Sequence, residues 1–186
     1  MNSDDTVLEI GGGIGILASV ASQVCKSVIS FEGCESSVKI AQAIKELNSL
    51  SKVKFVPNLV SGDGSEKQFA LYENFMMNST ERTLGEEKSI HTVTSVSLKS
   101  ALECRPDILV VDIEGGEKDL FYKIHPGALR SCRHIIVETH DHIVGLSGLN
   151  RLFMDLSACG FCYEPRIPNN HIVTFTNMAL EGERKW

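Results

Sequence analysis

The sequence predicts an α/β fold in which a doubly wound, mostly parallel β-sheet ends in a C-terminal antiparallel hairpin. Short apolar runs alternate with segments of helical periodicity, which indicates parallel strands covered by helices on both faces. Each chemically distinctive motif directly follows one of the apolar runs, where ligands bind in such sheets. A chain of 186 residues is most simply one domain, here residues 1–186.

Nine runs of β-forming residues are predicted as strands. They are residues 6–10, 28–32, 53–56, 68–72, 92–98, 108–112, 134–138, 161–163 and 171–175. Apolar stripes with helical spacing predict helices over 17–24, 38–47 and 149–156. Residues 73–89 are polar and are predicted as a loop. The last two strands, with Pro165 and Pro168 between them, predict the closing hairpin.

Composition excludes several classes of function. The net charge is -6 and the chain has one Trp and three Tyr, so a nucleic-acid partner is not expected. No apolar stretch approaches the roughly 20 residues that a membrane span needs. The polar N-terminus, Met1-Asn2-Ser3-Asp4-Asp5, lacks the features of a signal peptide. A cytoplasmic protein without a membrane span is therefore expected.

Six cysteines are expected to be reduced thiols, because no secretory signal is evident. Cys159-Gly160-Phe161-Cys162 is a lone CxxC motif. A zinc site would need a second pair of ligands at suitable spacing. The two thiols are therefore interpreted as small apolar residues near a helix-to-strand turn.

The first motif is the glycine-rich turn Glu9-Ile10-Gly11-Gly12-Gly13-Ile14-Gly15. Glycines at 11, 13 and 15 let the backbone approach a ligand closely, and the next helix offers free N–H groups. A nicotinamide site is an alternative, because residues 13–18 match GxGxxA, and a merely structural turn is another. The GxGxxA match begins two residues late, and Glu9 stands where dinucleotide sites usually carry an apolar residue. An acidic group there suits the ammonium of a methionine moiety, so S-adenosylmethionine is the expected cofactor of Glu9, Gly11, Gly13 and Gly15.

The second motif is Phe31-Glu32, which ends the second predicted strand. An acidic residue at this place can accept both hydroxyl groups of a ribose. The alternative is a solvated Glu32 near the start of the following helix. Together with the glycine turn, Glu32 is predicted to bind the cofactor.

The third and fourth motifs carry the candidate catalytic residues. Asp112-Ile113-Glu114-Gly115-Gly116-Glu117 follows the most apolar run, and Val137-Glu138-Thr139-His140 ends the next one. The acidic block could serve substrate positioning, metal binding or proton transfer, or it could only stabilise the first turn of a helix. His140 has a usual pKa near 6.5, which suits a general base, although a loop histidine is often a bystander.

Together these motifs resemble the FkbM family of methyltransferases over about residues 7–163. Phe31-Glu32 stands in place of the family's Phe-Glu-Pro, and residues 112–117 stand in place of Asp-Val-Glu-Gly-Ala-Glu. Val137-Glu138-Thr139-His140 replaces the Glu-x-His strand end. The chain departs from the family at Gly33-Cys34-Glu35, where Pro-Asn-Pro is usual. It also starts five residues before the first predicted strand, so the usual N-terminal covering segment is expected to be lacking.

The resemblance implies a Rossmann-like class I methyltransferase fold and S-adenosylmethionine-dependent methyl transfer to a hydroxyl oxygen of a sugar, glycan or natural product. Asp112, Glu114 and His140 are the expected catalytic residues. Two mechanisms remain open, because either His140 takes the proton directly or a divalent cation held by Asp112 and Glu114 activates the hydroxyl. The first is favoured, so no metal ligand is assigned. The alternatives in function are a non-catalytic cofactor-binding module and an NAD-dependent oxidoreductase.

Overall fold

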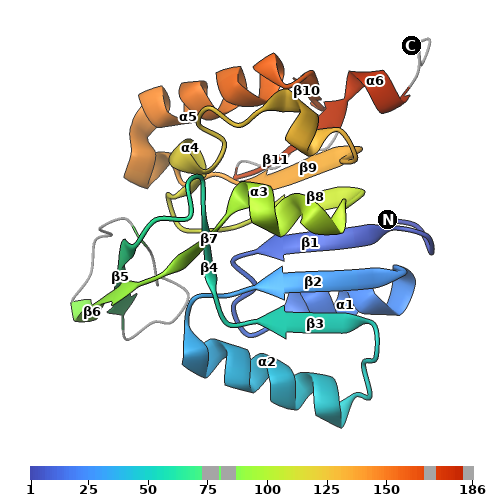
Figure 1. Cartoon of the computed structure of the whole chain (residues 1–186), viewed down its shortest axis with the longest axis vertical. Coiled ribbons are helices and arrows are strands. Elements are labelled where there is room, and N and C mark those ends of the chain that lie inside the picture. The colour runs from blue at the N-terminus through green and yellow to red at the C-terminus, as the bar shows by residue number, and fades with distance from the viewer. Residues whose placement is uncertain (73–79, 81–86, 166–170, 182–186) are drawn as a thin grey trace.

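The computed structural model describes residues 1–72, 80, 87–165 and 171–181. A seven-stranded sheet forms the centre of the molecule. The strand order is β10-β11-β9-β8-β1-β2-β3 (Figure 1). The strands of this sheet are β1 (Thr6–Ile10), β2 (Ser27–Phe31), β3 (Val53–Val56), β8 (Ile108–Val111), β9 (His134–Glu138), β10 (Phe161–Tyr163) and β11 (Ile172–Asn177). β11 runs antiparallel to both of its neighbours, and the other pairings are parallel. The predicted fold class and closing hairpin are confirmed.

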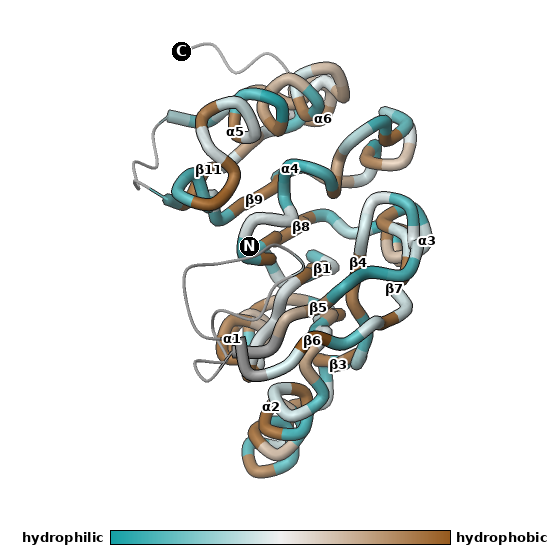
Figure 2. Tube along the Cα trace, turned by 90° about the vertical axis from the view of Figure 1, so that its left-hand side faces the viewer, coloured by the Kyte–Doolittle hydropathy of each residue, from teal (hydrophilic) through white to brown (hydrophobic). Residues whose placement is uncertain are grey.

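Helices connect these strands and cover both faces of the sheet. They are α1 (Ile16–Val24), α2 (Glu35–Leu47), α3 (Leu98–Ala101), α4 (Glu117–Leu120), α5 (Asp141–Ala158) and α6 (Met178–Glu181), with the 3-10 helices η2 (Leu102–Cys104) and η3 (Pro126–Leu129). Figure 2 shows α1 and α3 on opposite sides of β1. The chain runs outward from β1 to β3 and then returns to pair β8 with β1 on its other side. The strand order therefore switches between β1 and β8.

The alternation of side chains along β1 divides the core into two layers. Val7 packs with Ala18 and Ala21 of α1 on one face of the sheet. Leu8 and Ile10 face the other side, among residues of α3, α4 and α5. All four residues of β8 are buried on both faces, which explains the uninterrupted apolar run in the sequence.

Two small sheets lie beside the main one. β4 (Leu59–Ser61) pairs parallel with β7 (Ser95–Ser97), and β5 (Lys67–Tyr72) pairs antiparallel with β6 (Glu87–Val93). The predicted strand 92–98 is therefore wrong, because it is divided between β6, β7 and the start of α3. Ser97 explains this boundary, since its side chain accepts a hydrogen bond from Ser100 N and caps α3. The predicted loop 73–89 lies mostly outside the described residues, and its last three residues belong to β6.

The predicted helices begin later than the observed ones. α2 starts at Glu35 instead of residue 38, and α5 starts at Asp141 instead of residue 149. Gly145 has a non-helical φ of 67° and interrupts α5. Because of this break, the residues of α5 before Gly145 do not share one helical pattern with those after it. The CxxC motif lies at the predicted helix-to-strand turn, because Cys159 is the C-cap residue of α5 and Cys162 lies in β10.

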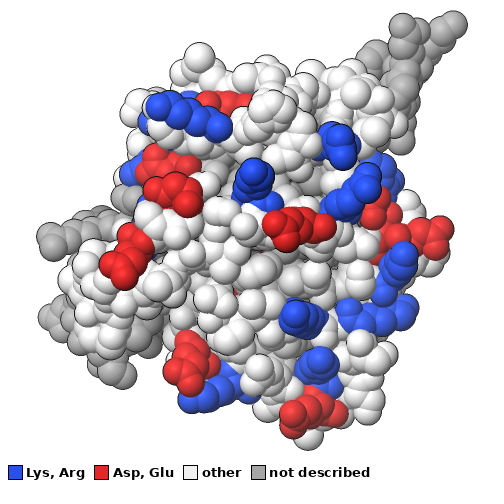
Figure 3. All heavy atoms as spheres, in the orientation of Figure 1, with Lys and Arg blue, Asp and Glu red and all other residues white. Residues whose placement is uncertain are grey.

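The surface carries charges of both signs. On the face shown in Figure 3, Lys and Arg side chains lie among Asp and Glu side chains. Among the described residues, no helix combines the length and the apolar character that crossing a membrane requires.

Candidate functional site

The glycine-rich turn links β1 to α1 at the switch in strand order. The backbone N–H groups of Gly11 and Gly12 both donate to the carbonyl of Phe31, at 2.9 and 3.0 Å. Gly11 has a φ of +86°, and a Cβ atom there would lie 1.6 Å from the carbonyl oxygen of Asp112. Only glycine fits this position. The turn therefore lies tightly against the ends of β2 and β8.

Gly13 and Gly15 have different surroundings. Gly13 has a φ of +52°, and a Cβ atom there would meet nothing within 4 Å. A Cβ atom at Gly15 would lie within 2.8 Å of Phe55 and Ala41, so this glycine permits helix packing. Gly11 and Gly13 line the cavity described below, whereas Gly15 does not.

Glu9 projects from β1 beneath the turn and is buried. Its carboxylate accepts a hydrogen bond from the hydroxyl of Ser30, the residue beside it in β2. Burial raises the pKa of Glu9, and the Ser30 hydrogen bond offsets part of this rise. Glu9 thus forms the polar floor of the cavity.

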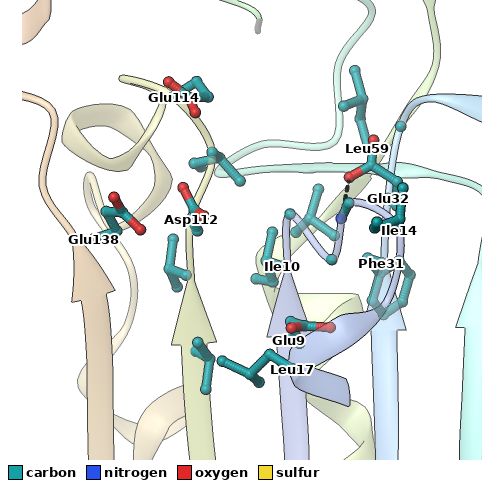
Figure 4. Close-up of a pocket in the computed structure, with 18 of the residues that line it drawn as sticks. Glu9, Ile10, Ile14, Leu17, Phe31, Glu32, Leu59, Asp112, Glu114 and Glu138 are labelled. Atoms are coloured by element: carbon teal, nitrogen blue, oxygen red, sulfur yellow. Dashed lines mark hydrogen bonds between the residues drawn. The ribbon is translucent and has the colours of Figure 1, made fainter. Parts of the chain in front are cut away.

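Glu32 follows β2 and faces the glycine turn (Figure 4). Its Oε2 accepts a hydrogen bond from Gly13 N at 2.8 Å, and its Oε1 accepts one from Cys34 N at 2.6 Å. Burial raises the pKa of Glu32, and these backbone hydrogen bonds offset part of the rise. The carboxylate therefore holds the turn and the start of α2 together while it lines the cavity.

A cavity of about 370 Å³ opens at the ends of β1, β2 and β8. This volume lies in the range of small-molecule sites. Its polar wall contains Glu9, Glu32, Asp112, Glu114 and Glu138. Its apolar wall contains Ile10, Ile14, Leu17, Phe31, Leu59, Phe69, Val110 and Ile136, among other residues.

Asp112 and Glu138 stand side by side on the rim of this cavity. Val111 pairs with Val137 in the parallel register of β8 and β9, so the next residue on each strand reaches the same edge. Figure 4 shows the two carboxylates turned toward each other. The pKa of Asp112 is raised to about 7, first by burial and then by the charge of Glu138.

His140 lies behind this rim, and carboxylates surround its ring. Its Nδ1 is 2.9 Å from Glu117 Oε1, which also accepts a hydrogen bond from Ile113 N. Its Nε2 is 3.3 Å from Glu114 Oε2 and 3.7 Å from Asp112 Oδ1. The structure therefore brings together the three residues that the sequence predicts as catalytic. His140 is 7% exposed in its side chain and is not part of the cavity wall.

The ionisation of His140 differs from the expectation. Burial by itself would lower the pKa of the imidazole, but Glu117, Glu114 and Asp112 raise it to about 9. The three carboxylates thus favour the protonated form of the ring. The predicted pKa near 6.5 is therefore wrong. That His140 takes part in methyl transfer to an acceptor hydroxyl group remains a prediction.

Sequence reasoning did not assign two partners in this site. Ser30 binds Glu9 through strand pairing, and Glu117 orients His140 from the first turn of α4. Glu117 belongs to the acidic block, but it is buried, whereas Asp112 and Glu114 are partly exposed. Neither this burial nor the contact with His140 can be read from the sequence, because both depend on how α4 packs against α5.

The overall fold is shared by many solved structures of methyltransferases. The FkbM methyltransferase from Methylobacillus flagellatus KT matches 95% of this chain at 13% identity, with a TM-score of 0.60, and the match covers 44% of that protein. Precorrin-6y C5,15-methyltransferase from Geobacter metallireducens GS-15 matches 95% of the chain at 12% identity, with a TM-score of 0.54 and 82% of its own length covered. A putative methyltransferase from Streptococcus mutans, solved in complex with SAH, matches 96% of the chain at 7% identity, with a TM-score of 0.54 and 91% of its length covered.

No protein-family profile and no curated protein matches the sequence. The low identities mean that these likenesses concern the fold. The chain has the Rossmann-like fold of class I S-adenosylmethionine-dependent methyltransferases.

Proposed function

We propose that this protein transfers a methyl group from S-adenosylmethionine to a hydroxyl oxygen of a sugar, a glycan or another small molecule. The observation that carries the proposal is the cavity between the glycine turn and the carboxylates at the ends of β8 and β9. It lies at the switch in strand order, where open α/β sheets bind their ligands. The resemblance of the sequence motifs to the FkbM family supports oxygen as the acceptor atom.

The residues around the glycine turn fit this cofactor. Gly13 leaves open space on the cavity side, where a ligand could reach the start of α1. Glu32 lies where it could accept the ribose hydroxyl groups, and Glu9 provides a buried negative charge that would attract the ammonium group. Bound S-adenosylmethionine would supply a methyl group on a positively charged sulfur.

The rim of the cavity would bind the acceptor. Asp112, Glu114 and His140 lie together beyond the glycine turn, so they could orient a hydroxyl group toward the bound methyl group. Positioning two reactants in one site provides a large part of the acceleration in such displacements. Carboxylates also accept hydrogen bonds from the hydroxyl groups of sugars, which agrees with a polyhydroxylated acceptor.

Binding of the cofactor product tests the proposal first. S-adenosylhomocysteine at 100 times its dissociation constant should add about 2.7 kcal/mol to the free energy of unfolding. For a domain of this size, that corresponds to a rise of roughly 5–10 °C in Tm. A Tm that rises with NAD and not with S-adenosylhomocysteine would contradict the proposal and favour an oxidoreductase.

Substitution of Glu32 tests the predicted cofactor contact. Glu32→Ala should weaken S-adenosylhomocysteine binding by about 1.5–3 kcal/mol in calorimetry, the usual scale for hydrogen bonds to a charged group. The matched control is Glu35→Gln, because Glu35 is exposed and pairs with Lys39 outside the cavity. Equal affinities of Glu32→Ala and the unsubstituted protein would remove Glu32 from the ribose site.

Transfer of a labelled methyl group separates catalysis from binding alone. The protein is incubated with labelled S-adenosylmethionine and a mixture of sugars and lipids from a cell extract. Label should enter a hydroxyl-bearing product, as an ether that is stable to mild base. Tight S-adenosylhomocysteine binding without any product would instead favour a cofactor-binding module.

A further inference from the structure

Three potential metal ligands meet where the rim of the cavity contacts the buried His140 behind it. Asp112, Glu114 and His140 each offer one ligand atom, and these atoms lie within 4.8 Å of one another. We infer that they bind one divalent cation, and that the cation is a first-row transition metal such as Mn²⁺ or Zn²⁺. Binding of the ion does not depend on the proposed function, whereas its use beside a methyl acceptor rests on that function.

The distances fit a common ion. Ligand atoms that each lie about 2.1 Å from one cation are separated by roughly 3.0–3.6 Å when the angle between them is 90–120°. In the structure, His140 Nε2 is 3.3 Å from Glu114 Oε2 and 3.7 Å from Asp112 Oδ1. The ligand atoms of Asp112 and Glu114 lie within 4.8 Å of each other, so these two carboxylates would rotate toward each other when an ion binds.

Glu117 prepares His140 for this task. Glu117 is buried and its Oε1 lies 2.9 Å from His140 Nδ1. A carboxylate in this position keeps the proton on Nδ1, so Nε2 can direct its lone pair at the other two carboxylates. Histidines that bind metals are commonly oriented by a carboxylate in this way.

Within the part of the chain that the structure describes, one oxygen of the three ligand residues has no hydrogen-bond partner. Asp112 Oδ1 is inaccessible to solvent, and no described residue donates to it. A proton on His140 Nε2 could satisfy one carboxylate oxygen along its bond direction, and Glu114 Oε2 is the nearer one. A cation between the three residues would satisfy both oxygens at once. The unpartnered oxygen is thus a second observation in favour of an ion.

The surrounding charge also favours a cation. Among the described residues, the charges that act on Asp112 come from the carboxylates of Glu138, Glu114 and Glu117 and from one imidazole. Like charges so close repel one another, and a divalent ion would offset this cost. Asp112 and Glu114 also line the cavity, so water or an acceptor oxygen could complete the coordination.

The ligand set indicates the kind of metal. Carboxylates suit Mg²⁺, Ca²⁺ and Mn²⁺, whereas imidazole suits zinc and the later transition metals. Two carboxylates with one imidazole therefore favour Mn²⁺ or Zn²⁺ over Mg²⁺. An ion here could lower the pKa of a coordinated hydroxyl group, which is the second of the two mechanisms that the sequence left open.

Titration of the metal-free protein with Mn²⁺ tests the inference. The full chain is treated with chelator, dialysed and titrated in a calorimeter. One ion should bind per chain, and Mg²⁺ should bind at least about tenfold more weakly than Mn²⁺. Asp112→Asn and His140→Gln should each weaken Mn²⁺ binding at least about tenfold. Glu117→Gln should weaken it by about 10–100-fold, the usual effect of removing the group that orients a ligand.

Asp119→Asn is the matched control, because Asp119 is an exposed acidic residue of α4 and its loss changes the net charge equally. Its Mn²⁺ affinity should equal that of the unsubstituted protein. Pulsed electron paramagnetic resonance of the bound Mn²⁺ should also detect one imidazole nitrogen, without any substitution that could disturb folding. That signal should be absent in His140→Gln.

Several results would overturn the inference. They are a lack of saturable binding of both Mn²⁺ and Zn²⁺, unchanged Mn²⁺ affinity in Asp112→Asn, and bound Mn²⁺ without a nitrogen ligand. S-adenosylhomocysteine binding is measured on the same preparation. Cofactor binding without metal binding would refute only the metal site, and metal binding without cofactor binding would refute only the proposed function.

Discussion

Gly11 and Gly13 lie two residues apart in one turn, yet they serve different purposes. Gly11 is pressed against the Asp112 carbonyl, whereas Gly13 borders open space in the cavity. Both have a positive φ, which an L-residue adopts only at a cost. At the residue scale, one glycine therefore serves the fold, and the other is free to serve a ligand.

Alanine at each position should separate these two roles. Gly11→Ala should lower the free energy of unfolding by about 2–5 kcal/mol, because backbone strain and overpacking add together. Gly13→Ala should cost only about 1 kcal/mol of stability, but it should weaken S-adenosylhomocysteine binding because its methyl group occupies cavity space. Denaturant unfolding and calorimetry measure the two effects. Equal losses of stability would contradict the distinct environments of the two glycines.

At the scale of the element, α1 reverses the usual helical pattern. Its buried side chains are small, namely Ala18, Ser19, Ala21 and Ser22. Its large apolar side chains face outward, and Ile16, Val20 and Val24 are each more than half exposed. The close approach of α1 to the sheet explains the small residues, since a larger side chain would separate the two layers.

Two substitutions in α1 test this arrangement. Ala21→Leu should lower the free energy of unfolding by about 1–3 kcal/mol, because the added atoms overpack the layer between α1 and the sheet. Val20→Gln should change it by no more than about 0.5 kcal/mol, because the side chain is exposed. Urea denaturation compares the two variants. A larger loss in Val20→Gln than in Ala21→Leu would mean that the outer face of α1 is the packed one.

At the scale of the whole molecule, an ion pair joins two residues that lie far apart in the sequence. Arg133, just before β9, pairs with Asp5, just before β1, across 128 positions of sequence. Asp5 is buried, and Asp107 Oδ2 accepts a hydrogen bond from Thr6 N at the same edge of the sheet. These contacts fix the edge opposite the cavity, where β1, β8 and β9 begin.

Removal of the arginine should therefore destabilise the whole domain. Arg133→Ala leaves a buried carboxylate without its partner, and we expect a loss of about 2–3 kcal/mol. This is less than the usual cost of breaking a fully buried pair, because Arg133 is 32% exposed in its side chain. Lys39→Ala breaks the exposed pair with Glu35 and serves as the control, with no measurable change expected. A cooperative unfolding transition at the same denaturant concentration in both variants would refute the structural role of the pair.

The local pattern of the sequence sufficed to predict most strands of the main sheet. It also sufficed to predict that the acidic residues and His140 follow the ends of these strands. The run of residues 108–112 is apolar at every place but the last, and the glycines at 11, 13 and 15 mark a sharp turn. Such patterns depend on neighbours along the chain, and parallel strands place their carboxyl ends at one edge. The sequence alone therefore predicts that Asp112, Glu114 and His140 lie near one another at this edge of the sheet.

The tertiary structure alone decided what each of these groups contacts. Glu117 and His140 are 23 residues apart, and Glu9 and Ser30 are 21 apart, so no local pattern predicts either pair. The same holds for the pKa of His140, because it depends on three carboxylates that the packing of α4, β8 and α5 brings together. The sequence by itself determined which chemical groups reach the cavity edge. Packing between distant elements determined their burial, their partners and the direction of their pKa shifts, because electrostatic and hydrogen-bond energies depend on distances in space.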